Sequence, residues 1–483
     1  MKTKKLKVLL LTLPIVLSGC GNSSKGADVK IKFWHTFGQT VVDGLNTKIK
    51  KFKQLVKEHD GLTVDVELSY QGNYDDIAEK IDKGYSVGNK PTIAVAYPDN
   101  VADYLQIGNA AGDEFVVNLD TYINSAEAGF GKEKWLGDAY DQEDFVEDFF
   151  SEGSKYVKKG TYSLPYMKST EIMFYNMTTL VEFMKGYKPE FNDSETQIKN
   201  YMDNLSWEEF VNLCTYIKAH MAEVSDQLQI PFAYDSDANL IISKMFQEGI
   251  QYTSISDTGV ASIEFGKGEN LTKTTALLES LNDLYQNGLM TTKGIRGTYS
   301  SDFFTGEKCV FTIGSSGGSG YNMPKAGAFT LGVCKVPASN NNPLYVSQGP
   351  TLAMFNDAAL GAEKNEQTKA YAWKFMKYIT NGEVNADLCV NGSEGYIPVR
   401  YSAYSTQLFQ EYMELGENYA KCSDVVVNKI NSDCGYLVTD AFKGSAALRD
   451  ACGSLLTSAI QVKDKSTIPG LINDAIDAAS LKM

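Results

Sequence analysis

The alternation of apolar and polar positions at the start of the chain predicts a strand followed by a helix. Residues 28–35, DVKIKFWH, alternate apolar side chains with lysines, which is the period of a strand with one buried face. Residues 40–61 instead repeat apolar positions at intervals of three and four, and they end on Gly61, which suits a left-handed helix end. The apolar positions of this predicted helix are Val42, Leu45, Ile49, Phe52 and Val56.

The same order of elements then repeats. Residues 62–70, LTVDVELSY, alternate again as a second strand, and a short helix is expected over residues 74–83. Residues 91–99, PTIAVAYPD, form a near-continuous apolar run of the kind found in buried parallel strands. Strand, helix, strand, helix and strand in this order predict an open α/β sheet.

Two later segments carry the signals of surface helices. Residues 205–221 place Ser206 three positions before Glu209, which is the pattern of a capping box at a helix start. Residues 274–288 repeat leucines at helical spacing and close on an Asn-Gly pair. We therefore expect helices in the second half of the chain that serve as scaffold.

The first twenty residues have the pattern of an exported lipoprotein. Four lysines precede an apolar run at residues 8–17, which is about half the length that a bilayer-spanning helix needs. The sequence LSGC that follows resembles the bacterial lipobox, and it predicts that residues 1–19 are removed and that Cys20 is lipidated. Residues 20–27 then read as a flexible tether. The alternative is a cleaved leader with an incidental cysteine.

Charge and cysteine content exclude several classes of function. Loss of the leader removes four lysines and moves the formal net charge from −15 to −19, which argues against nucleic acid as a partner. Seven cysteines remain after Cys20 with no CxxC pair, and the chain has three histidines, so a zinc site has little support. Export permits disulfides without requiring them. The sequence implies no metal and no cofactor.

A glycine- and serine-rich stretch at residues 314–320 imitates a catalytic motif. Gly314, Ser316 and Gly318 match G-x-S-x-G, the nucleophile elbow of α/β-hydrolases, in which the histidine follows the serine along the chain. All three histidines here precede Ser316, which excludes that order. The stretch is then either a merely flexible loop or a loop whose backbone N–H groups a polar ligand can approach closely.

Five segments together resemble one known family. IKFWHTFG, YQGNYDDIAEKI, LPYMKSTEIMFYNM, FFTGEKCVFTIGSSGGSG and GSEGYIPVRYSAY occur in the order and spacing of the extracellular solute-binding proteins of carbohydrate-type ABC importers. The sn-glycerol-3-phosphate-binding branch looks closest. The resemblance implies a two-lobed α/β fold of the periplasmic-binding-protein type II, with a ligand cleft between the lobes and no enzymatic activity.

The resemblance also implies how the chain is divided into lobes and which partners it binds. Lobe 1 would comprise residues 28–168 and 347–400, and lobe 2 residues 169–346 and 401–483. The implied partners are a sugar or a glycerol-phosphate-type solute, and an ABC permease with its cytoplasmic ATPase. The protein would act as a monomer, anchored by its lipid to the outer face of the bacterial cell membrane.

The resemblance implies a set of ligand-binding residues. Ser169 and Gly317 match family motifs, and Asp75 stands where the glycerol-phosphate branch has a glutamate. Aromatic rings favour sugar binding because sugars stack on flat apolar faces. The expected ligand-binding residues are Trp34, Tyr74, Asp75, Ser169, Tyr234, Ser316, Gly317, Tyr396 and Arg400.

The sequence departs from the glycerol-phosphate branch at several positions. Asp75 is one methylene shorter than glutamate, an expected tryptophan is absent, and Asp235 and Asp237 would repel a phosphate. Arg449 does not align clearly with a family position. A neutral sugar is therefore an equal expectation. A surface-anchored glycoside hydrolase, with two carboxylates across a sugar, and a non-transport surface lipoprotein stay open as alternatives.

Overall fold

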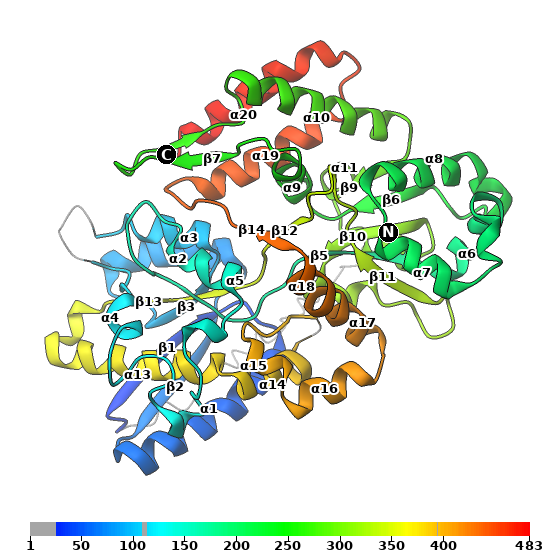
Figure 1. Cartoon of the computed structure of the whole chain (residues 1–483). Helices are drawn as coiled ribbons and strands as arrows, with labels where there is room; N and C mark the ends of the chain where they lie inside the picture. The colour runs from blue at the N-terminus through cyan, green and yellow to red at the C-terminus, as the bar shows by residue number, and fades with distance from the viewer. Residues whose placement is uncertain (1–25, 109–113, 394) are drawn as a thin grey trace, which may run out of the picture.

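The computed structural model describes residues 26–108, 114–393 and 395–483. The predicted leader and the lipidation site Cys20 lie outside these residues. Two five-stranded mixed sheets, well separated in space, form the centres of two lobes (Figure 1). The α/β fold class predicted from the sequence is confirmed.

The first sheet has the strand order β2-β1-β3-β13-β4. Its strands are β1 (Val29–His35), β2 (Val64–Tyr70), β3 (Ile93–Ala96), β4 (Leu164–Pro165) and β13 (Thr351–Met354). β1 pairs in parallel with both β2 and β3, whereas β13 runs antiparallel to β3 and β4. The strand–helix–strand pattern read from the sequence thus produces the parallel half of this sheet.

Helix α1 (Gln39–Asp60) agrees in most respects with the helix that the apolar pattern predicts. Gly61 ends it in the left-handed conformation with φ 72°, as expected. Four of the five predicted apolar positions are buried, but at the first turn Val41 is buried and Val42 is only partly buried. The helix also begins at Gln39, before the expected start. Its buried stripe therefore enters the core through Val41 and not through Val42.

The second sheet has the order β11-β5-β10-β6-β9. Its strands are β5 (Glu171–Asn176), β6 (Ile230–Tyr234), β9 (Met290–Thr292), β10 (Cys309–Ser315) and β11 (Leu331–Lys335). β10 is parallel to β6 and antiparallel to β5. The glycine-rich stretch follows β10 directly, as the short helix η6 (Ser316–Asn322).

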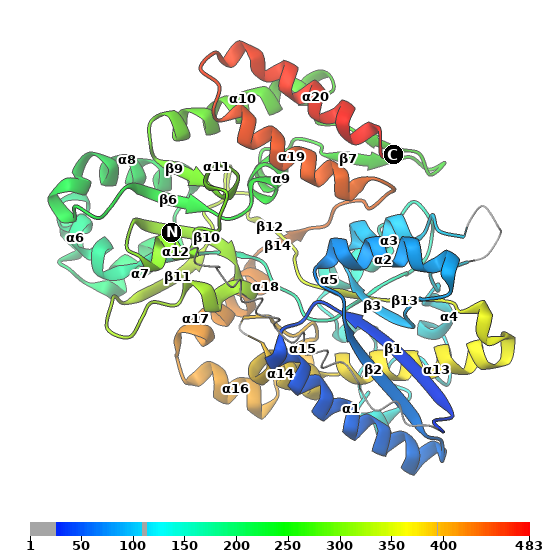
Figure 2. The same cartoon turned by 180° about the vertical axis from the view of Figure 1, so that it is seen from behind.

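The remaining helices surround the two sheets, and α10, α19 and α20 form an upper layer in both views (Figures 1 and 2). Ser206 and Glu209 form the predicted capping box at the start of α8. Besides α1, the α-helices of at least seven residues in the described part of the chain are α2 (Tyr74–Val87), α3 (Pro98–Tyr104), α6 (Met177–Tyr187), α7 (Glu195–Asp203), α8 (Trp207–Val224), α9 (Asp237–Gln247), α10 (Gly268–Gln286), α13 (Ala362–Thr380), α14 (Gly382–Gly392), α16 (Gln407–Glu414), α17 (Asn418–Asp424), α19 (Ser445–Ala459) and α20 (Ile468–Ser480).

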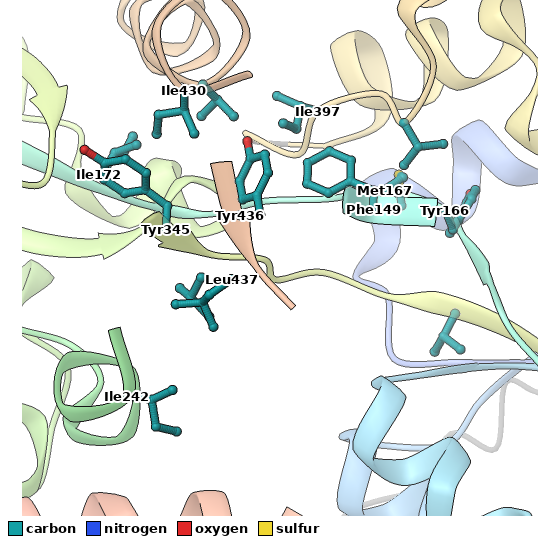
Figure 3. Close-up of a cluster of buried hydrophobic side chains, with 14 of the residues drawn as sticks. Phe149, Tyr166, Met167, Ile172, Ile242, Tyr345, Ile397, Ile430, Tyr436 and Leu437 are labelled. Atoms are coloured by element: carbon teal, nitrogen blue, oxygen red, sulfur yellow. The ribbon is translucent and has the colours of Figure 1, made fainter. Parts of the chain in front are cut away.

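Three chain segments cross between the lobes and lie side by side. The backbones of Ser169 and Gln348 exchange two hydrogen bonds of 2.9 and 2.8 Å, and those of Lys168 and Ile397 exchange two of 3.1 and 2.8 Å. Beside them, β12 (Leu344–Val346) pairs with β14 (Gly435–Leu437). A row of buried side chains packs along this crossing (Figure 3), and it includes Phe149, Tyr166, Met167, Ile172, Tyr345, Ile397 and Tyr436.

The seven described cysteines are all free thiols, and six of them are buried. Apolar burial therefore holds each lobe together in the described part of the chain, without covalent cross-links. Among the described residues, no helix combines the length and the apolar character that a membrane span needs.

Candidate functional site

Two adjoining cavities of about 560 and 620 Å³ lie between the lobes. Together they form what we call the interlobe cavity. Their walls come from α2 and α3 beside the first sheet, and from β5, α9, η6 and α19 beside the second. The residues that line both parts are Tyr97, Ser236, Asn239, Lys293, Tyr299 and Gln348.

The first-lobe wall is built on two helix starts. Asn73 caps α2 and, through a capping box with Asp76, fixes the position of Tyr74 and Asp75, both of which line the cavity. Tyr97 precedes α3, and its ring centre lies 4.3 Å from that of Tyr74 at an interplanar angle of 45°. Burial, and then the neighbouring Tyr97, raise the pKa of Tyr74, so its hydroxyl stays a hydrogen-bond donor.

The opposite wall contains the predicted glycine-rich contact. Gly317 lines the cavity, and a Cβ atom there would lie 3.0 Å from Cε1 of Tyr396 and 3.3 Å from Oγ of Ser169. The Ser315 hydroxyl donates to the Ser169 hydroxyl at 3.2 Å. Any larger residue would crowd these neighbours, so glycine suits this position, and Ser169, Gly317 and Tyr396 line one part of the cavity.

A chain of polar contacts runs from the second sheet across to the first lobe. Asn239 donates to Oε1 of Glu171 at 3.0 Å, and Nη1 of Arg449 donates to Oδ1 of Asn239 at 3.0 Å. Nε of Arg449 then donates to Oδ2 of Asp99 on α3 at 3.3 Å. Arg449 therefore connects the two lobes through the cavity wall.

Glu171, at the start of β5, is the most perturbed carboxyl group of this wall. Burial raises its pKa to about 7, while the hydrogen bonds from Tyr234 and Asn239 act in the opposite direction. The Tyr234 hydroxyl donates to Oε2 of Glu171 at 2.5 Å. Near neutral pH this carboxyl group can thus be protonated or ionised inside the site.

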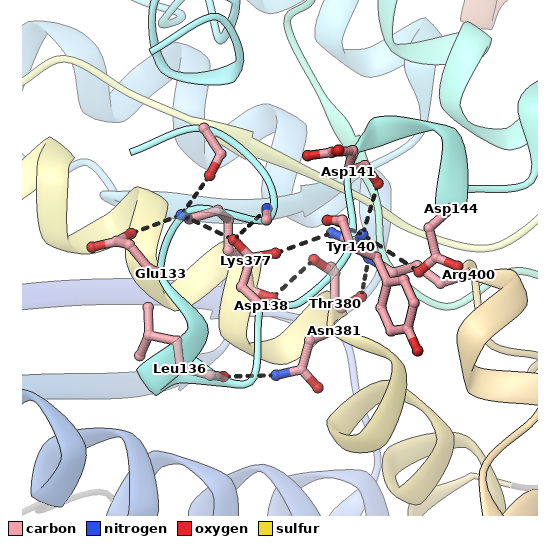
Figure 4. Close-up of polar contacts among 12 residues, drawn as sticks. Glu133, Leu136, Asp138, Tyr140, Asp141, Asp144, Lys377, Thr380, Asn381 and Arg400 are labelled. Carbon is pink, nitrogen blue, oxygen red and sulfur yellow. Dashed lines mark hydrogen bonds and ion pairs between the residues drawn. The ribbon is translucent and has the colours of Figure 1, made fainter. Parts of the chain in front are cut away.

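Arg400, a predicted ligand contact, lies outside the cavity in a buried ionic cluster (Figure 4). Its Nε donates to the carbonyl of Thr380 at 2.8 Å, and its Nη1 lies 3.6 Å from Asp144. The guanidinium also lies 3.9 Å from the ring centre of Phe145. Asp138, 3.9 Å from Nη2 of Arg400, joins it to Lys377, which also pairs with Glu133 at 2.7 Å. We call these residues the Arg400 cluster.

Three other predicted contacts are also absent from the cavity lining. Trp34 is buried in β1, and Tyr234 is buried behind Glu171, which lies between it and the cavity. The Ser316 side chain is buried, and its hydroxyl accepts a hydrogen bond from the backbone N–H of Thr170 at 3.3 Å. The structure thus brings five predicted residues to the cavity, namely Tyr74, Asp75, Ser169, Gly317 and Tyr396.

The sequence did not identify several residues of the wall. Tyr97 follows the apolar run of β3 and precedes a proline, so its place at a strand's carboxyl end was a usable signal. Glu171 and Gln348 carry no such signal, because their place depends on how distant crossing segments pair. Asp235, expected to repel a phosphate, does line the cavity, whereas Asp237 does not reach the interlobe part.

The fold and the cavity define a two-lobed solute-binding protein with the architecture of periplasmic binding proteins. The sequence matches the model of the family described as bacterial extracellular solute-binding protein over residues 49–417, and the chain belongs to this family. This is a family of binding proteins and not of enzymes. Among curated protein sequences, none matches the chain significantly.

Solved structures of binding proteins share the fold over nearly the whole chain. UgpB from Mycobacterium tuberculosis, in complex with glycerophosphocholine, gives a TM-score of 0.65 at 16% identity, covering 94% of this chain and 98% of that one. The cyclic α-maltosyl-1,6-maltose binding protein from Arthrobacter globiformis gives 0.66 at 14% identity, with 93% and 98% covered. The GacH receptor of Streptomyces glaucescens, crystallised with and without acarbose, gives 0.62 at 16% identity, with 93% and 98% covered.

Proposed function

We propose that the protein captures a solute for an ABC importer and presents it to the membrane permease. The solute is a sugar or a compound of the glycerol-phosphate or glycerophosphodiester type. Family membership supports the capture of a solute, and the ligands named for similar structures support these two chemical classes. The observation that carries the proposal is the interlobe cavity, whose walls come from both lobes.

Capture follows from the position of the cavity. A ligand bound to one wall gains contacts with the other wall only when the lobes approach, so ligand favours the closed arrangement. Lobe 1 would comprise residues 28–168 and 347–400, and lobe 2 residues 169–346 and 401–483, with the three crossing segments as the hinge. Small backbone rotations there would move Tyr74 and Tyr97 relative to Asn239 and Gly317.

A thermal-shift screen followed by small-angle X-ray scattering tests this proposal. The screen uses maltotriose, other sugars, sn-glycerol 3-phosphate and glycerophosphodiesters. A compound that raises the melting temperature is expected to reduce the radius of gyration, whereas an inactive compound leaves it unchanged. An identical radius with and without a saturating amount of the active compound would contradict closure.

The proposal includes a lipid anchor at Cys20. The lipobox-like sequence supports it, because cysteine is the residue that receives the diacylglycerol. Cys20→Ser is expected to abolish labelling by a fatty-acid probe in the producing bacterium, while Cys434→Ser keeps it. Labelling of the Cys20→Ser protein at the normal level would contradict the anchor.

A further inference from the structure

The charges on the cavity walls are strongly unequal. Six carboxyl groups line the two parts, whereas the basic side chains there are Lys293 and Arg449. Glu152 already pairs with the buried Lys168 at 2.6 Å, and burial raises the pKa of Glu171 to about 7, so the unneutralised excess rests on the four aspartates. The six carboxyl groups are those of Asp75, Asp99, Glu152, Glu171, Asp235 and Asp450. Walls that carry mostly one sign of charge concentrate ligands of the opposite sign, so this cavity favours a cation over a phosphate.

Both basic side chains already have partners. Arg449 contacts Asp99 and Asn239. The Lys293 ammonium lies 3.8 Å from the ring centre of Tyr299, and its charge lowers the pKa of the neighbouring Asp235, which burial raises more strongly. A phosphate would have to compete with these contacts, and it would meet the surrounding carboxylates.

Two carboxylates face the cavity without such partners. Asp75 lies on α2 of the first lobe and Asp450 on α19 of the second. Within the described residues, no hydrogen bond or ion pair reaches either carboxylate. Burial, and then the charge of Asp75, raise the pKa of Asp450, while the neighbouring Arg449 lowers it, so the carboxylates of Asp75 and Asp450 repel each other across the cavity. A ligand that displaces water between them must supply positive charge or donors.

Three uncharged residues of the wall contain hydrogen-bond acceptors that lack partners. Gln348, Ser347 and Asn322 line the cavity, and Oε1 of Gln348, Oγ of Ser347 and Oδ1 of Asn322 are buried atoms that have no hydrogen-bond partner among the described residues. All three can accept a hydrogen bond. A protonated amine offers three donors and no acceptor, whereas a phosphate dianion offers acceptors alone.

We propose that the ligand of the interlobe cavity is a polyhydroxyl compound with a protonated amino group, an amino sugar in chemical terms, held between Asp75 and Asp450. This deepens the proposed function and rests on it. The N–H groups of the amine donate to the carboxylates of Asp75 and Asp450, and the positive charge removes the repulsion between these carboxylates of opposite lobes. The rings of Tyr74 and Tyr97 beside Asp75 favour a cation further.

Matched ligands that differ in the amino group test the inference by calorimetric titration. The chitosan disaccharide is compared with N,N′-diacetylchitobiose, which has the same skeleton without the charge, and glucosamine with glucose. Glycerophosphocholine is the third probe, because its quaternary ammonium has charge but no N–H donor. We expect the chitosan disaccharide to bind at least tenfold more tightly than its diacetylated partner, and more tightly than glycerophosphocholine.

Three variants test whether the carboxylates of Asp75 and Asp450 recognise the amino group. Asp75→Asn and Asp450→Asn should each reduce the tenfold preference at least fivefold, because each removes one charge from the cavity. Asp474→Asn removes the same charge from an exposed position on α20 outside the cavity, and it should leave the preference unchanged.

Two outcomes would overturn the inference. One is that neither amine-bearing probe binds, or that the neutral partners bind as tightly. The other is that the preference survives in both Asp75→Asn and Asp450→Asn. If maltotriose or glycerophosphocholine still binds and compacts the protein in these cases, the proposed function stands without the amino-sugar assignment.

Discussion

Arg400 and Arg449 lie in two regions of the molecule that differ in how deeply they bury the guanidinium group and in the partners they give it. In the Arg400 cluster the guanidinium is 1% exposed and lies among carboxylates, carbonyls and a phenyl ring. In the wall of the interlobe cavity, the side chain of Arg449 is 29% exposed and pairs with Asp99 of the other lobe. A buried charge surrounded by partners serves the folded state, whereas a partly exposed charge between lobes is placed to respond to ligand or movement.

Arg400→Ala is the largest expected effect. It leaves the partly buried carboxylate of Asp144 without its counter-charge and the buried Asp138 with Lys377 as its remaining basic partner, which costs on the order of 3–5 kcal/mol of unfolding free energy. Arg400→Lys should lose less, because it keeps the charge without the planar fork. Urea denaturation measures both values. A loss below about 1 kcal/mol for Arg400→Ala would show that the cluster does not stabilise the lobe.

The next effect concerns Glu171 and depends on pH. Its pKa of about 7 lies above the ordinary value, so the native state keeps a proton that the unfolded chain releases. The contribution to stability is complete below about pH 4.5 and is lost as pH rises to about 7, by an amount on the order of 2–3 kcal/mol.

Glu171→Gln should remove this decrease in the unfolding free energy with rising pH, because the amide keeps the shape of the side chain but does not titrate. The measurement is urea unfolding at several pH values between 4.5 and 8, with the exposed Glu414→Gln as control. Parallel stability curves for wild type and Glu171→Gln would contradict the raised pKa.

Gly317→Ala tests the close packing of the cavity wall. A Cβ atom 3.0 Å from Tyr396 must displace its ring or narrow the cavity, so we expect about a tenfold loss of ligand affinity, equivalent to about 1.4 kcal/mol. Gly318→Ala is the matched control, because its nearest neighbour would be Cδ2 of Tyr321 at 3.9 Å. Equal affinities for the two variants would remove Gly317 from the site.

The smallest expected effect on stability is that of Arg449→Ala. A partly exposed ion pair contributes about 1 kcal/mol or less, so the unfolding free energy should change little, in contrast to Arg400→Ala. Because the contact with Asp99 connects α3 to α19, its loss should increase the radius of gyration of the ligand-free protein. Arg296→Ala, in the second lobe beside Phe303, serves as control. An unchanged radius would limit Arg449 to a local role.

The sequence predicted much of the fold because the relevant signals are local. Alternating positions in β1 and β2, the continuous apolar run of β3 and the capping box of α8 each depend on residues close in the chain. The burial of Val41 instead of Val42 shows the limit of this approach. When a helix begins earlier than expected, the buried position in its first turn can fall on the neighbouring apolar residue.

The site was less predictable because its walls depend on distant contacts. Gly317 faces Ser169 only after the crossing segments have paired, and Glu171 meets Asn239 only after α9 packs beside β5. The sequence around Arg400 indicates a guanidinium group with several hydrogen-bond donors. It does not indicate that the carboxylates of Asp138 and Asp144, more than two hundred positions away in the chain, will be its partners. Residue type alone could not distinguish a ligand contact from a structural ion pair.

The paired crossing segments restrict how the two lobes can move. Ser169, Gln348, Lys168 and Ile397 hold the three backbones together as a short ribbon. A ribbon of this kind bends easily about one line but resists twist and sliding, because those motions would break its hydrogen bonds. If the lobes close as proposed, this pairing would leave them close to one rotational degree of freedom, and each closing would return the same residues to the same partners. Selectivity for a solute would then require no search among relative orientations of the lobes.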